Sequence, residues 1–205
     1  MHHFRAPDAR RFTSASLMIG IAFVIFGASF GVLSVSAGAS VAQSCAMSLL
    51  VFTGASQMSA VSVIASGGTV ASAFGGAVLL SGRNAVYGLA MSPVLKQGSL
   101  ASRLLGAQWV IDETTAVVSA ETDPATRRTA FWISGAILYA SWNIGTLLGA
   151  LVGSSINPSD FGLDAAFPVM FTAMIAPHLR TSAGRKAALF GAVAAVALAP
   201  FMPIG

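Results

Sequence analysis

Charged residues are scarce in this sequence. Only 9% of its 205 residues are charged, 55% are hydrophobic, and the mean hydropathy is +0.78. Because a soluble domain is usually about 25% charged, this composition excludes a soluble globular protein and indicates an integral membrane protein. A spanning helix needs about 20 apolar residues, so the length allows roughly six to eight spans and no separate soluble domain. We treat residues 1–205 as one transmembrane domain, in which residues 1–13 form a cytoplasmic N-terminal segment.

Residues that bind metals or drive catalysis are also scarce. The one cysteine, Cys45, excludes an internal disulfide and a cysteine-rich metal site. The sequence has no metal-ligand cluster, nucleotide-binding motif or phosphate loop, so no cofactor is expected. Gly54 and Ser56 match part of the Gly-x-Ser-Gly motif of intramembrane serine proteases, but Gln57 replaces the last glycine, and no enzyme is expected. The net charge of +4 comes from bases that flank apolar segments, which is typical of membrane topology and not of nucleic-acid binding.

Long apolar segments are what the sequence has in abundance. They predict an all-α, polytopic membrane fold with about seven transmembrane helices. The glycines and the many alanines and serines favour close packing between these helices. The predicted spans cover residues 14–37, 41–66, 69–95, 104–120, 130–153, 165–180 and 186–204.

Basic residues predict the orientation of these spans, because Lys and Arg are enriched in cytoplasmic loops. With seven spans and a cytoplasmic N-terminus, only Lys96 and Arg103 face outward. The eight bases that face the cytoplasm are then Arg5, Arg10, Arg11, Arg127, Arg128, Arg180, Arg185 and Lys186. The sequence therefore favours this topology over one without the span at 104–120, which separates the bases less well.

Arg83 is the only charged residue between Phe12 and Leu95. Holding an arginine within a membrane costs from about 2.5 to more than 10 kcal/mol, so such a residue has a partner and usually a function. Asp112 and Glu113, in the next span, are the candidate partners, but adjacent helical residues point about 100° apart and cannot both face Arg83. Two interpretations stay open. The pair is a salt bridge that docks two spans, or one carboxyl pairs while the other belongs to a substrate or proton site.

Several positions favour interruptions of the helices. Gly54, Ala55, Ser56 and Gln57 lie mid-span, where they fit either a broken helix with free backbone N–H groups or a tight helix crossing. The candidate helix breaks are Gly54, Gly82 and Pro168. Trp142 and Asn143 lie beside a glycine stripe that favours helix packing, although Asn143 is polar and deep in its span.

A faint internal similarity links two pairs of spans. Val51-Phe52-Thr53-Gly54 has a counterpart in Met170-Phe171-Thr172-Ala173, and Phe30-Gly31 has a looser one in Trp142-Asn143-Ile144-Gly145. Transporters are often built from repeats, but small-residue-rich sequences also match by chance. Internal repeats with broken helices and a fold without repeats are therefore both open.

The ordered set of motifs resembles the AzlC family, the large subunits of bacterial branched-chain amino acid exporters. The resemblance covers almost the whole chain. The motifs that carry it are Phe30-Gly31, Phe52-Thr53-Gly54-Ala55-Ser56-Gln57, Arg83-Asn84 with Tyr87-Gly88, Asp112-Glu113, Trp142-Asn143-Ile144-Gly145-Thr146 with Gly149, and Phe167-Pro168. The resemblance implies a multi-pass protein of the bacterial inner membrane that exports valine, leucine, isoleucine and methionine, with a small AzlD-like membrane subunit as partner. It also implies secondary transport driven by the proton-motive force. Many relatives have histidine where this chain has Asn84, so a titratable role at that position is lost here.

Polarity and depth place the hypothetical site on these motifs. Arg83 and the backbone of Gly54–Gln57 would face a substrate carboxylate, and Asp112 or Glu113 would accept the ammonium group or a coupling proton. The predicted substrate-binding residues are Gly54, Ala55, Ser56, Gln57, Arg83, Asn84, Tyr87, Trp142 and Asn143. A passive channel for a small neutral solute and a non-transporting membrane scaffold are the alternative functions, and a homo-oligomer is left open.

Overall fold

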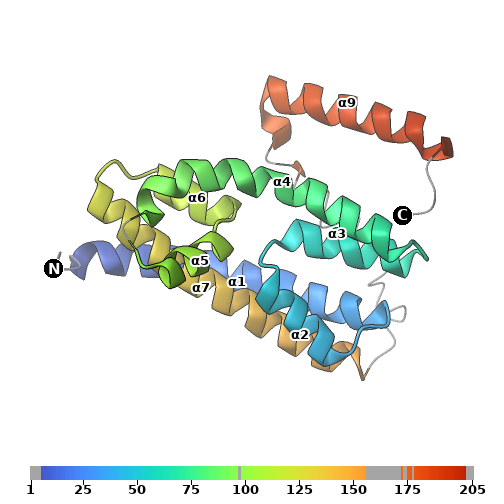
Figure 1. Cartoon of the computed structure of the whole chain (residues 1–205), viewed down its shortest axis with the longest axis horizontal. Coiled ribbons are helices and arrows are strands. Elements are labelled where there is room, and N and C mark those ends of the chain that lie inside the picture. The colour runs from blue at the N-terminus through green and yellow to red at the C-terminus, as the bar shows by residue number, and fades with distance from the viewer. Residues whose placement is uncertain (1–5, 97, 156–171, 173–174, 177, 202–205) are drawn as a thin grey trace.

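The computed structural model describes residues 6–96, 98–155, 172, 175–176 and 178–201, and helices dominate this part of the chain (Figure 1). The predicted all-α fold is confirmed, because no β-strand occurs among the described residues. The helices are α1 (Ala6–Ser36), α2 (Val41–Leu50), α3 (Gly54–Ala65), α4 (Val70–Leu95), α5 (Leu100–Gln108), α6 (Asp112–Ser119), α7 (Pro124–Gly153), η3 (His178–Arg180), α9 (Ser182–Leu198) and η4 (Ala199–Phe201).

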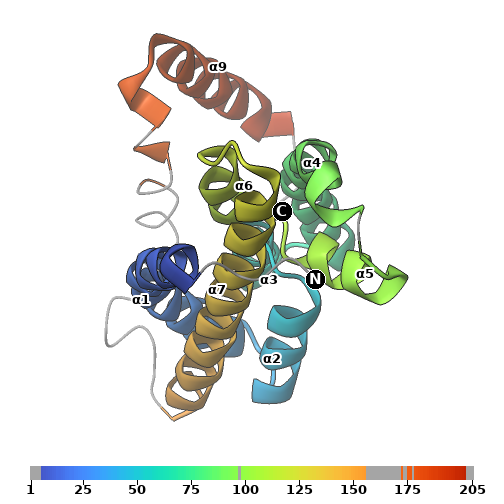
Figure 2. The ribbon, with the colours of Figure 1, turned by 90° about the vertical axis from the view of Figure 1, so that its left-hand side faces the viewer.

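The helices α1 and α7 form a tightly packed parallel pair (Figures 1 and 2). Gly145 lies against the backbone of Val24, and four residues further along both helices Gly149 lies against Ala28. A Cβ atom at Gly149 would overlap the carbonyl oxygen of Ala28, so this contact requires glycine. The glycine stripe of α7 therefore acts in helix packing, as small residues do between membrane helices.

The segment α2–α3 is a hairpin that enters the bundle from one end and returns to that same end. α2 starts at the end where α1 finishes and runs inward, and its Ser48 hydroxyl donates to Thr146 of α7 at 3.1 Å. After a break at residues 51–53, α3 runs back along α4, and Ser56 contacts Ser81 at 2.9 Å. Ile64, at the end of α3, lines a cavity together with Ala37, which directly follows α1. The hairpin therefore does not cross the bundle.

The segment α5–α6 is a second hairpin, and it enters from the opposite end. The Gln108 side chain, at the end of α5, donates to the backbone carbonyl of Leu49 at 3.0 Å, so the tips of the two hairpins meet. After a break at residues 109–111, α6 returns and buries Val118 in one apolar cluster with Phe12 of α1. Glu121, just after α6, forms an ion pair with Arg11 in the first part of α1, so this hairpin returns to the end of the bundle where α1 starts.

The chain thus repeats one succession of elements in opposite directions. α1 is followed by the hairpin α2–α3, and α4 is followed by the hairpin α5–α6 entering from the other end (Figure 1). Both hairpins break over three residues, 51–53 and 109–111. This arrangement is typical of transporters built from inverted repeats. The sequence similarity suggested a different pairing, of the segment around Phe52 with the segment around Phe171. Of the latter segment, only Thr172 is among the described residues.

The two hairpins correct the predicted spans. The segments 41–66 and 104–120 each fold as two short helices that turn back, so the count of seven crossing helices is not confirmed. Three helical segments among the described residues are long and apolar enough to cross a membrane, 9–36, 124–153 and 182–201. α4 is also long, with 26 residues, but carries Arg83 near its middle and is not among the three. Most of the predicted span 165–180 lies outside the described residues.

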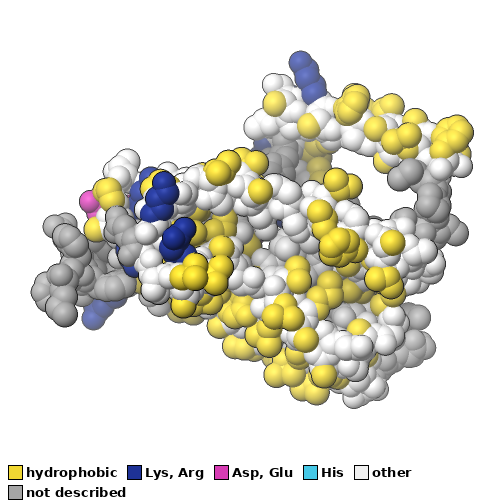
Figure 3. Space-filling model, viewed as in Figure 1, with side chains coloured by type: hydrophobic (Ala, Val, Ile, Leu, Met, Phe, Trp, Pro, Cys, Tyr) yellow, Lys and Arg dark blue, Asp and Glu magenta, His cyan; other side chains and the backbone are white. Residues whose placement is uncertain are grey.

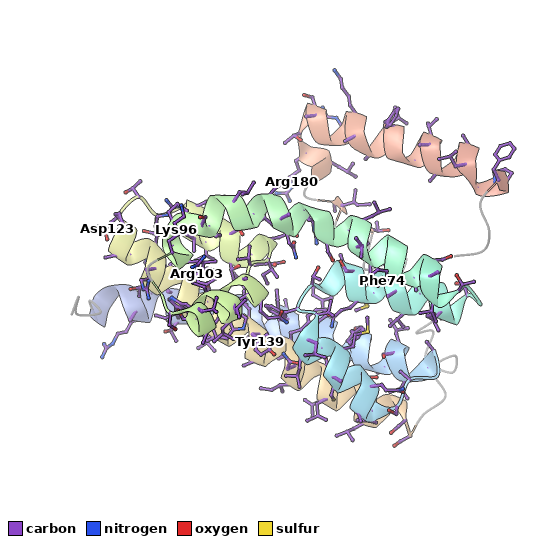
Figure 4. The ribbon with its side chains drawn as sticks, viewed as in Figure 1. Phe74, Lys96, Arg103, Asp123, Tyr139 and Arg180 are labelled. Carbon is purple, nitrogen blue, oxygen red and sulfur yellow. The ribbon has the colours of Figure 1, made fainter. Side chains whose placement is uncertain are left out.

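Because α2–α3 turns back, Lys96 and Arg103 do not lie at the opposite end of the bundle from the N-terminal arginines, as the predicted topology required. Phe12 packs in one cluster with Val94, two residues before Lys96, so Lys96 lies at the same end as the start of α1. Figure 4 labels Lys96 and Arg103 close together near this end, which we call the basic end. Its members among the described residues are Arg10, Arg11, Lys96, Arg103, Arg127 and Arg128. The turns at the opposite, neutral end, residues 37–40 and 66–69, contain no charged residue.

Two predicted helix breaks have different outcomes. α4 runs without interruption through Gly82, so the break predicted there is wrong; the neighbouring helix-compatible residues keep the backbone ladder intact. A Cβ at Gly82 would meet nothing within 4 Å, and no packing contact requires a glycine at this position. Pro168 lies outside the described residues.

α9 buries none of its residues and lies apart from the bundle in both ribbon views (Figures 1 and 2).

Candidate functional site

A cavity of about 240 Å³ lies where the two hairpin tips meet beside the middle of α4. Each hairpin contributes the start of its second helix, α3 or α6, and α1 and α7 supply an apolar wall. The lining residues are Ile19, Ala22, Phe23, Phe26, Phe52, Thr53, Gly54, Ala55, Arg83, Asn84, Ile111, Asp112, Glu113 and Trp142. The cavity therefore gathers the polar motifs of three different predicted spans.

The start of α3 presents backbone N–H groups to the cavity. Thr53 precedes the helix in an extended conformation, with φ −150° and ψ 94°, and its side chain makes no capping hydrogen bond. The first N–H groups of a helix have no partner within the helix and carry a partial positive charge. Gly54 keeps them accessible, because a Cβ there would lie 2.8 Å from Cη2 of Trp142. This tip can accept an anionic group such as a carboxylate.

The start of α6 has the opposite character. Asp112 and Glu113 occupy its first turn and bring two carboxyl groups to the cavity. The Thr114 hydroxyl holds the break in place, since it accepts a hydrogen bond from the Ile111 N–H at 3.1 Å and lies 2.8 Å from the Trp109 carbonyl, to which it donates. Acidic groups at a helix start offset its positive end. This tip therefore favours a cationic group.

Arg83 lies between the two tips and forms the ion pair predicted from the sequence. Its Nη1 is 2.8 Å from Oδ2 of Asp112, and the two side chains are 36% and 33% exposed. A pair that is one-third exposed and lines a cavity is not sealed into a helix interface. Glu113 also lines the cavity, and no salt bridge joins it to any residue that the structure describes. One carboxyl group thus neutralises Arg83, and the other remains available to a ligand.

Aromatic side chains form the apolar part of the cavity. The Trp142 ring stacks on Phe30 with a centroid distance of 6.2 Å and meets Phe23 edge-on at 5.9 Å. Phe23 and Phe26 come from α1, and Phe52 comes from the first hairpin. The sequence did not indicate the α1 residues as site residues, because apolar side chains that face lipid and those that face a cavity look alike in a membrane helix.

Four predicted site residues do not line the cavity but support its walls. Ser56 is fully buried beneath the α3 tip, and the fully buried Gln57 donates from Nε2 to the Met47 carbonyl at 3.1 Å, bracing the hairpin. Asn143 donates to the carbonyl of Tyr139 one turn earlier in α7, at 2.8 Å. Tyr87, one turn along α4 from Arg83, interacts with Asp112. The other predicted residues, Gly54, Ala55, Arg83, Asn84, Asp112, Glu113 and Trp142, all line the cavity.

Comparisons with known proteins place these residues in a family context. The family model described as AzlC protein matches residues 18–156, which include both hairpins, α4, α7 and the part of α1 from residue 18 onward. An inner membrane protein of Escherichia coli, YgaZ, is 28% identical over 206 residues, covering 94% of this chain and 84% of the relative. An uncharacterized membrane protein of Helicobacter pylori is 24% identical, covering 96% of this chain and 86% of the relative. No solved structure matches the chain.

Proposed function

The chain belongs to the AzlC family of membrane proteins, and from this basis we propose that it is a secondary transporter that exports branched-chain amino acids. Valine, leucine and isoleucine are the proposed substrates, with methionine as an unbranched one. The proposal concerns the central cavity, where the two hairpin tips and Arg83 surround a space open to a small solute.

The observation that carries the proposal is the opposite polarity of the two tips. An amino acid is a zwitterion, so its site must favour a carboxylate and an ammonium group a few ångströms apart. The α3 tip offers uncapped N–H groups, while the α6 tip offers Glu113. In the proposed complex, the substrate carboxylate lies at Gly54 and Ala55, near Arg83, and the ammonium group lies at Glu113. Discontinuous helices bind substrates in this way in other transporters.

The apolar lining supports a hydrophobic substrate side chain. Phe23, Phe26 and Trp142 surround the remaining space. The volume of about 240 Å³ lies just below the range of about 300–1,000 Å³ typical of drug-sized ligands, which suits a small amino acid. Branched aliphatic side chains bury apolar surface against such rings without a polar group left unpaired.

Proton coupling is assigned to the acidic tip. Asp112 is held by Arg83, whereas Glu113 has no salt bridge within the described chain. In the proposed cycle, Glu113 binds the substrate ammonium group in one state of the transporter and a proton in the other. Export then exchanges the substrate ammonium group for a proton at the Glu113 carboxylate. Arg83 and Asp112 neutralise each other throughout this cycle.

The charge distribution supports a cytoplasmic N-terminus in the bacterial inner membrane. The described bundle carries six basic residues at the basic end and none in the turns at the neutral end. Cytoplasmic loops are rich in Lys and Arg, so the basic end is proposed to face the cytoplasm. A small AzlD-like membrane subunit is the proposed partner, on the basis of family membership.

Efflux from intact cells tests the proposed function. Cells that lack other branched-chain exporters are loaded with a leucine-containing dipeptide, and external leucine is measured with and without an uncoupler. We expect the wild-type chain to give efflux that saturates and falls when the proton gradient is dissipated. We expect Arg83→Ala and Glu113→Gln to reduce efflux at least tenfold, since one interaction of this kind is worth about 1.4 kcal/mol or more.

Gly82→Ala serves as the matched control, since it neighbours Arg83 but its new methyl group would meet no atom within 4 Å. Its efflux should equal that of the wild type. Leucine efflux that does not saturate and continues without a proton gradient would instead indicate a passive channel. Wild-type efflux from both Arg83→Ala and Glu113→Gln would exclude the central cavity as the transport site.

A further inference from the structure

A second cavity lies away from the central one, in a groove between the last turns of α4 and the whole of α5. Its volume is about 290 Å³, and it opens near the basic end. The residues that line it are Gly88, Ser92, Leu95, Lys96, Leu100, Arg103, Leu104 and Ala107. None of them lines the central cavity, so the proposed amino acid site does not account for this groove.

The mouth of the groove carries two positive charges without acidic partners. Lys96 and Arg103 are exposed, and neither forms a salt bridge with any residue that the structure describes. By contrast, Arg11 and Arg83 are each paired with a carboxylate, of Glu121 and Asp112 respectively. Figure 3 shows the Lys and Arg side chains beside hydrophobic surface in the region where Figure 4 labels Lys96 and Arg103. This mouth favours an anionic group.

The rest of the groove is apolar and open. Leu100 and Leu104 are 69% and 64% exposed along its edge. Gly88 leaves space, because a Cβ built there has no neighbour within 4 Å. Gly88 and Lys96 are eight residues apart on α4, or about 12 Å along the helix axis. A ligand that fills the groove therefore has an anionic group at one end and an apolar chain that extends at least this far.

We propose that this groove binds an anionic phospholipid. Its phosphate lies between Lys96 and Arg103, and an acyl chain follows α4 past Ser92 to Gly88. Basic pockets between membrane helices on the cytoplasmic side bind phosphate-bearing head groups in this way. A free phosphate ion would use the charges but not the apolar part of the groove, and a zwitterionic lipid would use the apolar part but gain less from the two charges.

The lipid would also brace the second hairpin. α5 forms one wall of the groove, and its far end carries Gln108, which binds the backbone of Leu49 at the meeting point of the tips. Gly106 of α5 lies directly against the Leu95 side chain of α4. A lipid seated between α4 and α5 would therefore hold the acidic tip in register with Arg83. This proposal concerns the fold of the hairpin and does not depend on the transported solute.

Binding and thermal unfolding of the full-length chain in detergent test the proposal. Phosphatidylglycerol, phosphatidylethanolamine and inorganic phosphate are titrated separately, and bound lipid is counted by native mass spectrometry. We expect phosphatidylglycerol to bind more tightly than phosphatidylethanolamine and to raise the unfolding temperature, whereas phosphate alone does neither. Lys96→Gln and Arg103→Gln should each weaken phosphatidylglycerol binding about fivefold. Lys186→Gln, an equal charge change on the exposed face of α9, should have no effect.

Gly88→Leu tests the apolar part separately. A Cβ at this position meets no atom within 4 Å, and leucine favours a helix more than glycine does, so the unfolding temperature without lipid should stay the same or rise, while phosphatidylglycerol binding falls. Unchanged phosphatidylglycerol affinity in both Lys96→Gln and Gly88→Leu would overturn the proposal. So would inorganic phosphate that stabilises the chain as well as phosphatidylglycerol does. If these variants kept lipid selectivity but lost co-purification of a second membrane chain, the groove would be a protein interface and not a lipid site.

Discussion

The two hairpins have the same architecture but opposite chemistry at their tips. Each breaks over three residues and starts its second helix at the central cavity. Neither N-cap residue, Thr53 or Ile111, makes a side-chain capping hydrogen bond, but the start of α3 has no acidic residue, whereas α6 starts with Asp112 and Glu113. One tip therefore keeps the positive end of a helix available, and the other replaces it with negative charge.

This difference shows how a repeated architecture can make a dipolar site. Two identical tips facing each other would attract the same charge from both sides and would favour a simple anion. Because only the second tip is acidic, the cavity has a positive and a negative side with Arg83 between them. The comparison predicts that changes at the two tips have unequal effects, which the following variants test in order of decreasing size.

Making the first tip acidic should have the largest effect. Ala55→Asp would place a carboxylate in the first turn of α3, where the substrate carboxylate is proposed to lie. Because an acidic residue at a helix start is favourable, the chain should fold, while leucine efflux should fall at least tenfold through loss of the site. Efflux and the unfolding temperature of purified protein are the measurements. A folded variant with normal efflux would contradict the assigned polarity.

Filling the space at Gly54 should reduce transport next. A Cβ there would lie 2.8 Å from Trp142 Cη2, so Gly54→Ala would displace the indole or the tip. We expect several-fold lower efflux, because overpacking costs about 1–3 kcal/mol. The double variant Gly54→Ala with Trp142→Phe has a smaller ring and should recover part of the loss. Equal effects of the single and double variants would show that the collision does not matter.

The breaks themselves should differ in stability. Thr114 is fully buried and bridges Ile111 N–H and the Trp109 carbonyl, so Thr114→Val should cost about 1–3 kcal/mol of unfolding free energy. The Thr53 hydroxyl makes only a 3.3 Å contact with Ser56, so Thr53→Val should cost less than about 1 kcal/mol. Denaturant unfolding of both variants checks the difference. A larger loss for Thr53→Val would reverse the interpretation of the two tips.

The smallest effect is expected at Gly82, which belongs to neither tip. Gly82→Ala removes a glycine from the interior of a continuous helix and should leave stability unchanged or raise it by about 0.5–1 kcal/mol. Thermal unfolding checks this. A loss of stability would show that α4 needs conformational freedom beside Arg83, as the predicted helix break implied.

The sequence predicted the polar centre of the fold better than its topology. Arg83 was predicted to pair with Asp112 or Glu113 because isolated charges in a membrane need partners, and its Nη1 lies 2.8 Å from Oδ2 of Asp112. The hairpins were mistaken for spans because a segment that enters and returns has the same length and hydropathy as one that crosses. The error carried over to Lys96 and Arg103, whose side of the membrane depends on whether 41–66 crosses.

An amino acid bound in the cavity between the two tips should shield the cavity wall, so protection from alkylation is the decisive test of the proposed site. Ala22, which lines the cavity from α1, is replaced by cysteine in a Cys45→Ser background, and the rate of reaction with a small maleimide is measured with and without leucine. Gly191→Cys, on the exposed helix α9, is the control. We expect saturating leucine to slow the reaction at position 22 and not at position 191. Equal rates at position 22 with and without leucine would contradict it.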